Sequence, residues 1–214
     1  MITGKRGFKR EPVPAGTFPA RLYKIMHLGT IPDVYMGQQK LTNKIRLDWE
    51  LPTEMKVFDP EKGEQPLSIS KEYTLSMNEK SNLCKDIESW EGGKFTDDQV
   101  AESYDLTDLI GRDCMINVAH KVAAGSGNVY AYVASISPMP KGMECPPAFN
   151  PPFIWDYSDN FDESILEGLH DFFKDKIKSS AEYQAKMDPV DIDDAPMPNA
   201  EDEPVDSDGL PFWW

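Results

Sequence analysis

The stretch KIRLDWEL, residues 44–51, most constrains the fold of this chain, because apolar and charged side chains alternate along it without a break. Strict alternation is typical of an antiparallel strand that is buried on one face and solvated on the other. The apolar parity holds Ile45, Leu47, Trp49 and Leu51, and the charged parity holds Lys44, Arg46, Asp48 and Glu50. The pattern therefore predicts a β-sheet protein with Trp49 in its core.

Other segments show strand-like patterns of the same length class. We expect them over about 17–28, 67–76, 113–122 and 128–137. Lys24 lies on the core parity of the first segment, which predicts a β-bulge there. A loop is expected over about 29–42, and the GSGN sequence at 125–128 predicts a hairpin turn.

A helical segment separates the third and fourth strands. Ser76 and Glu79 form a capping-box pattern, and apolar residues at helical spacing follow as far as Trp90, before Gly92-Gly93. Trp90 is therefore expected to be structural. Thr96–Gln99 repeats the capping pattern for a short second helix, and DLTDLIG predicts one more turn, closed by Gly111.

The order of three strands, a helix and two strands predicts the fold class. It is the order of the OB-fold, so we expect a mainly β protein, a five-stranded Greek-key barrel with a helix between strands three and four. Other five-stranded barrels remain alternatives at this point.

Composition divides the chain into four parts. A basic N-terminal arm is expected over 1–16, the OB-fold domain over 17–140, a Pro-rich connector with an amphipathic helix over 141–186, and an acidic tail over 187–214. The helix, at about 160–178, is expected to pack on its own barrel or on a neighbour. The tail has the composition of a disordered segment.

Charge is distributed unevenly. The net charge is −15, yet residues 1–47 carry nine Lys and Arg against two acids, and residues 188–214 carry nine acids and no Lys or Arg. This asymmetry favours a body that binds a polyanion, together with an interaction arm.

The sequence carries no signal for metal, cofactor or catalysis. Cys84, Cys114 and Cys145 include no CxxC pair, so neither a disulfide framework nor a zinc site is indicated, and a reducing intracellular setting is expected. Cys114 and His120 share a parity and resemble half a metal site, but a buried thiol and a structural histidine are favoured. There is no HExxH motif, no Gly-rich phosphate loop and no apolar run that would span a membrane. We expect no enzyme, no cofactor and no membrane partner.

Cations and aromatic rings on the strands suggest single-stranded nucleic acid as a ligand, because cations pair with phosphates and rings stack on bases. The alternative interpretation is that each tyrosine is an ordinary strand residue that covers the core and binds no ligand. The candidate nucleic-acid-binding residues are Arg21, Tyr23, Lys24, His27, Tyr35, Lys40, Lys44, Arg46, Tyr130 and Tyr132.

The acidic tail ends in a group of bulky apolar residues. An acidic string mimics a nucleic-acid backbone, so it is expected to cover the basic groove until DNA displaces it, and its apolar end is suited to pockets on partner proteins. The alternative is a tail that only solubilises the protein. The residues predicted to bind partners are Asp206, Asp208, Leu210, Pro211, Phe212, Trp213 and Trp214.

The end of the chain and its body each resemble a known family. DSDGLPF resembles the C-terminal motif of bacterial single-stranded-DNA-binding proteins, which docks replication and repair partners; this chain departs from it by adding Trp213-Trp214. VPAGTFPARLYKIMHLGT, IRLDWELP and SISKEYTLSMNEKSNLCKDIESWEGGKFT resemble a family of bacteriophage replication or single-stranded-DNA-binding proteins with an OB-fold core, over most of residues 10–150.

The resemblance implies a phage-encoded protein in the cytoplasm of the bacterial host. Such a protein coats and protects single-stranded DNA during DNA replication and recombination and recruits partners through its tail. The sequence does not determine the oligomeric state, and a homo-oligomer is one possibility. The alternatives are a protein-interaction adaptor for a recombinase or replisome, a nuclease or ligase fragment that kept an OB module, and a DNA mimic. The basic N-terminal quarter disfavours the mimic, and no motif supports the nuclease or the ligase.

Overall fold

The computed structural model describes most of the chain between the two termini. The described residues are 11–35, 37–97, 101, 103–123, 127–157 and 161–187. Most of the predicted arm and nearly all of the predicted tail, with its seven partner-binding residues, lie outside them.

The first two strands form one long hairpin. β1 (Gly16–Tyr35) pairs antiparallel with β2 (Gln38–Asp59) out to the pair Tyr35↔Gln38. The predicted loop over 29–42 is therefore wrong for most of its length. Pro32 suggested a loop but pairs with Leu41 in a two-stranded part of the sheet, and Gly37 at φ +79° makes the turn. The predicted bulge is confirmed, because the register shifts between Leu22 and Lys24.

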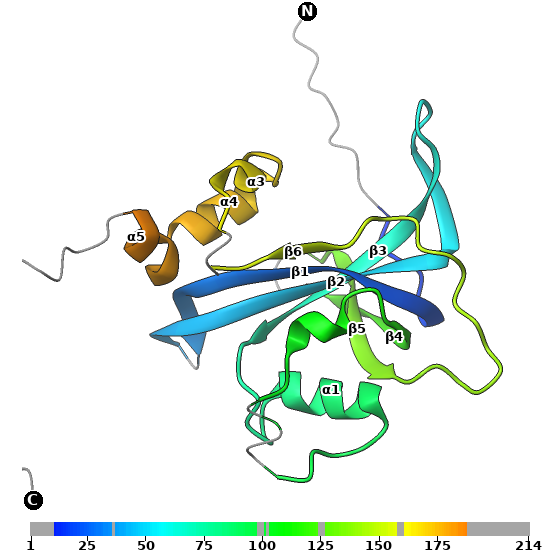
Figure 1. The fold of residues 1–214 in the computed structure, drawn as a ribbon. Helices are drawn as coiled ribbons and strands as arrows, with labels where there is room; N and C mark the ends of the chain where they lie inside the picture. The colour runs from blue at the N-terminus through cyan, green and yellow to red at the C-terminus, as the bar shows by residue number, and fades with distance from the viewer. Residues whose placement is uncertain are drawn as a thin grey trace, which may run out of the picture.

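Five strands form a nearly closed antiparallel barrel, which confirms the predicted fold class. β3 (Gly63–Thr74), β4 (Asp113–Val122) and β5 (Val129–Ser137) complete the order β3-β2-β1-β4-β5, and β3 lies near β5 where the barrel closes. Helix α1 (Asn82–Glu91) lies between β3 and β4 in the chain and covers one end of the barrel (Figure 1). This is the OB arrangement, in which the outer face of strands two and three and the adjoining loops bind ligands.

The barrel interior follows the alternation of β2. Within residues 44–51 of β2, Ile45, Leu47, Trp49 and Leu51 are all buried, and the Trp49 ring lies 6.2 Å from the Trp90 ring of α1, centroid to centroid. Trp90 Nε1 donates to the backbone oxygen of Asp113, 2.9 Å away, and ties α1 to β4. The expected structural roles of Trp49 and Trp90 are confirmed.

Helix α1 begins five residues later than its predicted capping box. Its N-cap is Ser81, whose Oγ accepts from the Cys84 backbone N–H at 3.0 Å and donates to the Ser76 carbonyl at 2.6 Å. The helix ends at Gly92 as predicted. The turn predicted before Gly111 is also present, as the 3₁₀ helix η1 (Leu106–Leu109). At the predicted second helix, the Ala101 N–H donates to the Asp97 carbonyl, and residues 98–100 lie outside the described part.

The C-terminal part of the described chain packs on the long hairpin, on the other side from α1 (Figure 1). A short strand β6 (Phe153–Trp155) pairs parallel with β1, and three helices follow within the described residues. They are α3 (Glu163–Glu167), α4 (Asp171–Lys178) and α5 (Ala181–Met187). A second buried cluster joins them to β1 and consists of Met26, Leu28, Trp155, Leu166, Ile177 and Tyr183.

The single amphipathic helix predicted over 160–178 is therefore divided. Gly168 caps the end of α3, and His170 caps the start of α4 by accepting from the Phe172 N–H through Nδ1. The helices pack on their own barrel, which answers the question that amphipathicity alone left open. None of the helices in the described part of the chain has the length and hydropathy needed to cross a bilayer.

Candidate nucleic-acid interface

Arg21, the first predicted phosphate-binding cation, pairs with groups of its own chain. Its Nε donates to Asp113 Oδ1 at 2.7 Å, and its Nη1 donates to the Pro146 carbonyl at 2.7 Å. Nη1 also lies 3.9 Å from Glu50 Oε1. This guanidinium therefore joins β1 to β4 and to the connector.

Lys44 and Arg46 are paired as well. Lys44 Nζ lies 2.5 Å from Asp33 Oδ2 across the hairpin, and this contact lowers the pKa of Asp33. Arg46 Nε lies 2.7 Å from Asp48 Oδ1, and its guanidinium lies 4.6 Å from the centre of the Phe173 ring of α4. Both cations balance acids of the same sheet, so the charged face of β2 is close to neutral.

The C-terminal segment covers the outer face of the β1–β2 hairpin. Glu50 is fully buried, and its carboxylate accepts from the backbone N–H groups of Phe149 (3.1 Å) and Asn150 (2.9 Å) and from Asn150 Nδ2 (2.7 Å). Farther along, the Glu182 carboxylate accepts from Thr30 N and Oγ1. This part of the face is occupied by the chain itself.

Of the remaining predicted residues of the hairpin, some contact the C-terminal segment and others face the solvent. His27 Nε2 lies 2.7 Å from Asn43 Oδ1, with its ring 5.1 Å from that of Tyr157. Lys24 Nζ lies 5.2 Å from the centre of the Phe153 ring. Lys40 is exposed, and only the backbone of Tyr35 is described, as the partner of Gln38.

Tyr23 and Tyr130 approach the same residue of β3, although they come from the first and the last strand of the barrel. The Tyr23 side chain hydrogen-bonds with the side chain of Ser68. Burial raises the pKa of Tyr23, the Asp48 carboxylate adds to this, and the bond to Ser68 opposes it. Ser68 and Tyr130 in turn line one groove, which Tyr23 does not line, so the two predicted rings are related through Ser68.

We call this groove the seam groove, because it lies where β3 and β5 meet. It has a volume of about 340 Å³. Its described lining comprises Glu11, Pro12, Val13, Ser68, Ile69, Ser70, Val129, Tyr130 and Ala131. Apolar atoms, hydroxyls and one ring suit it to the flat face of a base better than to a compact, highly charged molecule.

Lys121 is a cation beside these rings that the sequence did not single out. It pairs with Tyr130 across the β4–β5 ladder, and its Nζ lies 5.4 Å from the centre of the Tyr132 ring. Lys121 is exposed, and Tyr130 is 45% exposed. The pairing follows from the antiparallel register of β4 and β5, beyond which the Ala123 N–H donates to the Asn128 carbonyl, so this register was the signal that would have found Lys121.

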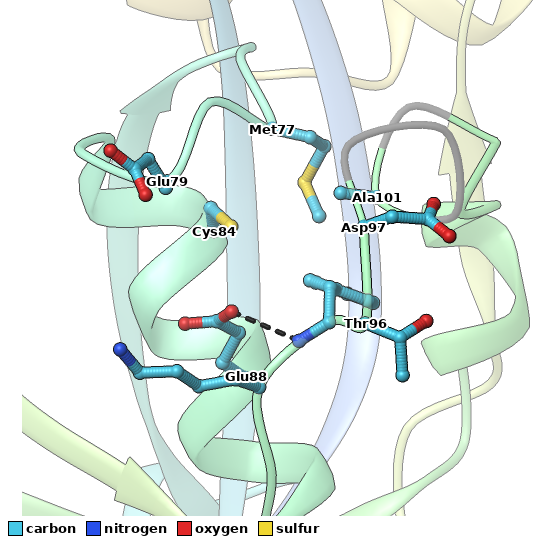
Figure 2. Close-up of a pocket in the computed structure, with 9 residues that line it drawn as sticks. Met77, Glu79, Cys84, Glu88, Thr96, Asp97 and Ala101 are labelled. Atoms are coloured by element: carbon cyan, nitrogen blue, oxygen red, sulfur yellow. Dashed lines mark hydrogen bonds between the residues drawn. The ribbon is translucent and has the colours of Figure 1, made fainter.

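A second cavity, of about 270 Å³, lies beside α1. Figure 2 shows Met77, Cys84 and Glu88 around it, with Glu88 accepting the backbone N–H of Phe95 at 3.0 Å. Within the described residues, no group of three or more His, Cys, Asp or Glu side chains is placed to hold a metal ion.

The half metal site suggested by Cys114 and His120 does not form. Cys114 is fully buried in the barrel core, and burial raises the pKa of its thiol. His120 lies at the exposed end of the strand, with Nε2 2.8 Å from the Val13 carbonyl. The favoured interpretation of a buried thiol and a structural histidine is confirmed.

Comparison of the chain with protein-family models, with curated proteins and with solved structures finds no match.

Proposed function

We propose that the protein binds single-stranded DNA, coats and protects it during replication and recombination, and recruits partner proteins through its acidic C-terminal tail. The role is stoichiometric, because the proposed interface supplies surface for bases and phosphates and no reacting group. The setting proposed for it is a bacteriophage infection, in the cytoplasm of the bacterial host.

One observation carries the proposal: Ser68, on the outer face of β3, hydrogen-bonds with Tyr23 and lines the same groove as Tyr130. Rings on this face of an OB barrel are placed to stack on successive bases. Stacking is tolerant of sequence, since every base has a π-face, and each base stacked on a ring contributes about 1–3 kcal/mol. Lys121, exposed beside Tyr130, supplies a cation at the same place.

A second candidate function is a protein-interaction adaptor built on the same barrel. The ion pairs of Arg21, Lys44 and Arg46 favour it, because these cations already neutralise acids of the chain. An adaptor requires no free cations on the barrel and is expected to leave single-stranded DNA unbound.

A titration of the full chain with fluorescent oligo-dT and with a duplex of equal length tests the proposal. We expect the single strand to bind more tightly than the duplex, and the affinity to fall as salt rises, because phosphate contacts release counterions. No titration of oligo-dT at low salt would reject DNA binding and leave the adaptor.

A further inference from the structure

β3 lines two grooves, one after the other along the strand. Residues 68–70 line the seam groove, and residues 71–74 line a second groove of about 320 Å³, which we call the lysine groove. Its described lining comprises Lys44, Lys71, Glu72, Tyr73, Thr74, Lys80, Ser81 and Asn82. The described lining of the seam groove has neither Lys nor Arg, whereas that of the lysine groove has three lysines. This difference bears on the proposed ligand, because phosphate contacts supply much of the affinity for nucleic acid.

The three lysines come from separate segments of the chain. Lys44 lies on β2, Lys71 on β3, and Lys80 in the turn before α1. Lys44 Nζ lies 2.5 Å from Asp33 Oδ2, and Lys71 Nζ lies 2.5 Å from Asp86 Oδ2. These acids hold the two ammonium groups in place. An ammonium group has three N–H donors, and each of these two directs one at its acid, so donors remain for an anion in the groove.

Lys80 gives the lysine groove its excess charge. Lys80 is exposed, and no carboxylate of the described residues lies within ion-pair distance of its Nζ. Glu72, the one acid of the described lining, accepts from Lys176 Nζ of α4 at 2.8 and 3.0 Å. With the other three charged residues of the lining balanced by partners of opposite charge, the positive charge of Lys80 remains.

A phosphodiester of a polynucleotide suits this groove. It carries one negative charge, which equals the excess charge, and its oxygens accept from ammonium groups, from the exposed Thr74 hydroxyl and from the exposed Asn82 amide. A nucleoside triphosphate carries more negative charge than the groove balances. A base finds no ring to stack on in the described lining, because Tyr73 is 2% exposed and its hydroxyl donates to Asp86 Oδ2 at 2.7 Å.

The two grooves are spaced for one strand of nucleic acid. From Ser68 to Thr74 the backbone of β3 advances by six residues, or roughly 20 Å at 3.3–3.4 Å per residue. At a rise of about 3.4 Å per nucleotide, about six stacked nucleotides cover this length. An OB-fold binds about 4–16 nucleotides, so one strand is long enough to occupy both grooves.

We propose that the lysine groove binds a backbone phosphate of single-stranded nucleic acid whose bases lie in the seam groove. Lys80 supplies the charge, Lys44 and Lys71 supply N–H donors, and the strand follows β3 from one groove to the other. This inference rests on the proposed function and adds to it the phosphate-binding residues of the barrel.

The first test compares two full-length variants that each lose one positive charge. Lys80→Gln removes the excess charge of the lysine groove. The control is Lys141→Gln, which changes an exposed lysine of the connector that belongs to the described lining of neither groove. The readout is the slope of log Kobs against log salt for oligo-dT. For single strands each lost phosphate contact reduces this slope by about 0.7, so we expect that loss for Lys80→Gln and none for Lys141→Gln.

A second variant separates a local contact from the net charge of the protein. Asp33→Asn combined with Lys44→Gln removes an ion pair and leaves the net charge unchanged. The Asp33 side chain is 40% exposed and that of Lys44 is 19% exposed, so we expect the fold to be kept, which urea unfolding checks. If Lys44 donates to a phosphate, this variant also loses about 0.7 in slope. An unchanged slope would overturn the role given to Lys44.

The outcomes distinguish the lysine groove from the proposed function. If the unaltered chain does not bind oligo-dT, both fail. If it binds and Lys80→Gln keeps the slope of Lys141→Gln, only the lysine groove fails. Inorganic phosphate, added at constant ionic strength, tests for a small ligand. Competition with oligo-dT in the unaltered chain that is lost in Lys80→Gln would assign the groove to a small phosphate compound and overturn the proposal.

Discussion

Tyr23 of β1 and Ser68 of β3 share a hydrogen bond that crosses β2, the strand between them. The bond links a side chain of the first strand to the third strand. Ser68 also lines the groove that Tyr130 lines, so this face combines residues from β1, β3 and β5.

Replacing Tyr130 with Ala is expected to weaken binding of oligo-dT by about 1–3 kcal/mol, because one stacking ring is lost, while Tyr130→Phe keeps most of the affinity. Fluorescence titration measures the change. The control is Tyr104→Ala, a ring that packs on Phe95 beside α1. Equal losses for the Tyr130 and Tyr104 variants would speak against stacking at the groove.

Deleting residues 188–214 is expected to tighten binding of single-stranded DNA and to abolish partner recruitment, because nine acids and the aromatic end are removed together. Changing only Leu210, Phe212, Trp213 and Trp214 to Ser separates the two effects. That variant keeps the acids, so its DNA affinity should match the unaltered chain while recruitment is lost. An unchanged affinity after the full deletion would rule out masking by the tail.

Glu50→Gln is expected to lower the free energy of unfolding by about 1.5–3 kcal/mol, the value of hydrogen bonds to a charged group. The carboxylate is fully buried and accepts three N–H bonds from Phe149 and Asn150. Urea unfolding measures the loss, and limited proteolysis should cut the connector faster. Glu64→Gln, at an exposed position of β3, is the control and should change neither.

Gly29→Ala is expected to destabilise the packing of α5 on β1. Gly29 has φ +81°, and a Cβ there would lie 2.6 Å from Ser180 Cβ. Gly37→Ala is a matched control, because Gly37 has φ +79° and open space around it. Both variants carry the backbone cost of roughly 1–2 kcal/mol, so a larger fall in Tm for Gly29→Ala isolates the steric clash. Equal falls would contradict the close packing of Ser180.

The Glu91–Arg112 pair predicts a pH dependence. Arg112 Nη1 donates to Glu91 Oε1 at 2.6 Å and Nη2 to Oε2 at 3.0 Å, and these bonds hold the pKa of Glu91 below its ordinary value of 4.5. A lowered pKa in the folded state contributes stability above the unfolded value, which is lost as pH falls through the folded one. Glu91→Gln should therefore reduce stability near pH 7 and have a smaller effect near pH 3. Urea unfolding across this range measures the difference, and a pH-independent effect would contradict the assignment.

The sequence predicted the barrel well because its signal is local. Alternation along β2 identified the core, and the bulge before Lys24 followed from one residue on the wrong parity. The long hairpin was missed because Pro32 and Gly37 resemble loop residues, and its Ile31 is buried without a continuous apolar face to signal it.

The candidate site was harder to predict because its decisive contacts join residues far apart in the chain. Arg21 was expected to meet phosphate, yet its partner Asp113 lies 92 positions away and Pro146 lies 125 away. Residue type gives the chemistry of a side chain but not which groups of its own chain will neutralise it. The relation of Tyr23 and Tyr130 to Ser68 depends on the same long-range closure.

β1 is shared by β2, β4 and β6, and this has a consequence for synthesis in the cell. Thr30 is bonded by Glu182, which is synthesised 152 residues later. At a synthesis rate of about 5–20 residues per second, the delay is roughly 8–30 s. Until then, Met26 and Leu28 of the nascent chain are not fully buried by the C-terminal helices that pack on them in the folded protein. The chain must therefore leave the ribosome as far as α5 before the apolar outer side of the hairpin is fully shielded, which makes that interval the one in which chaperones have most to protect.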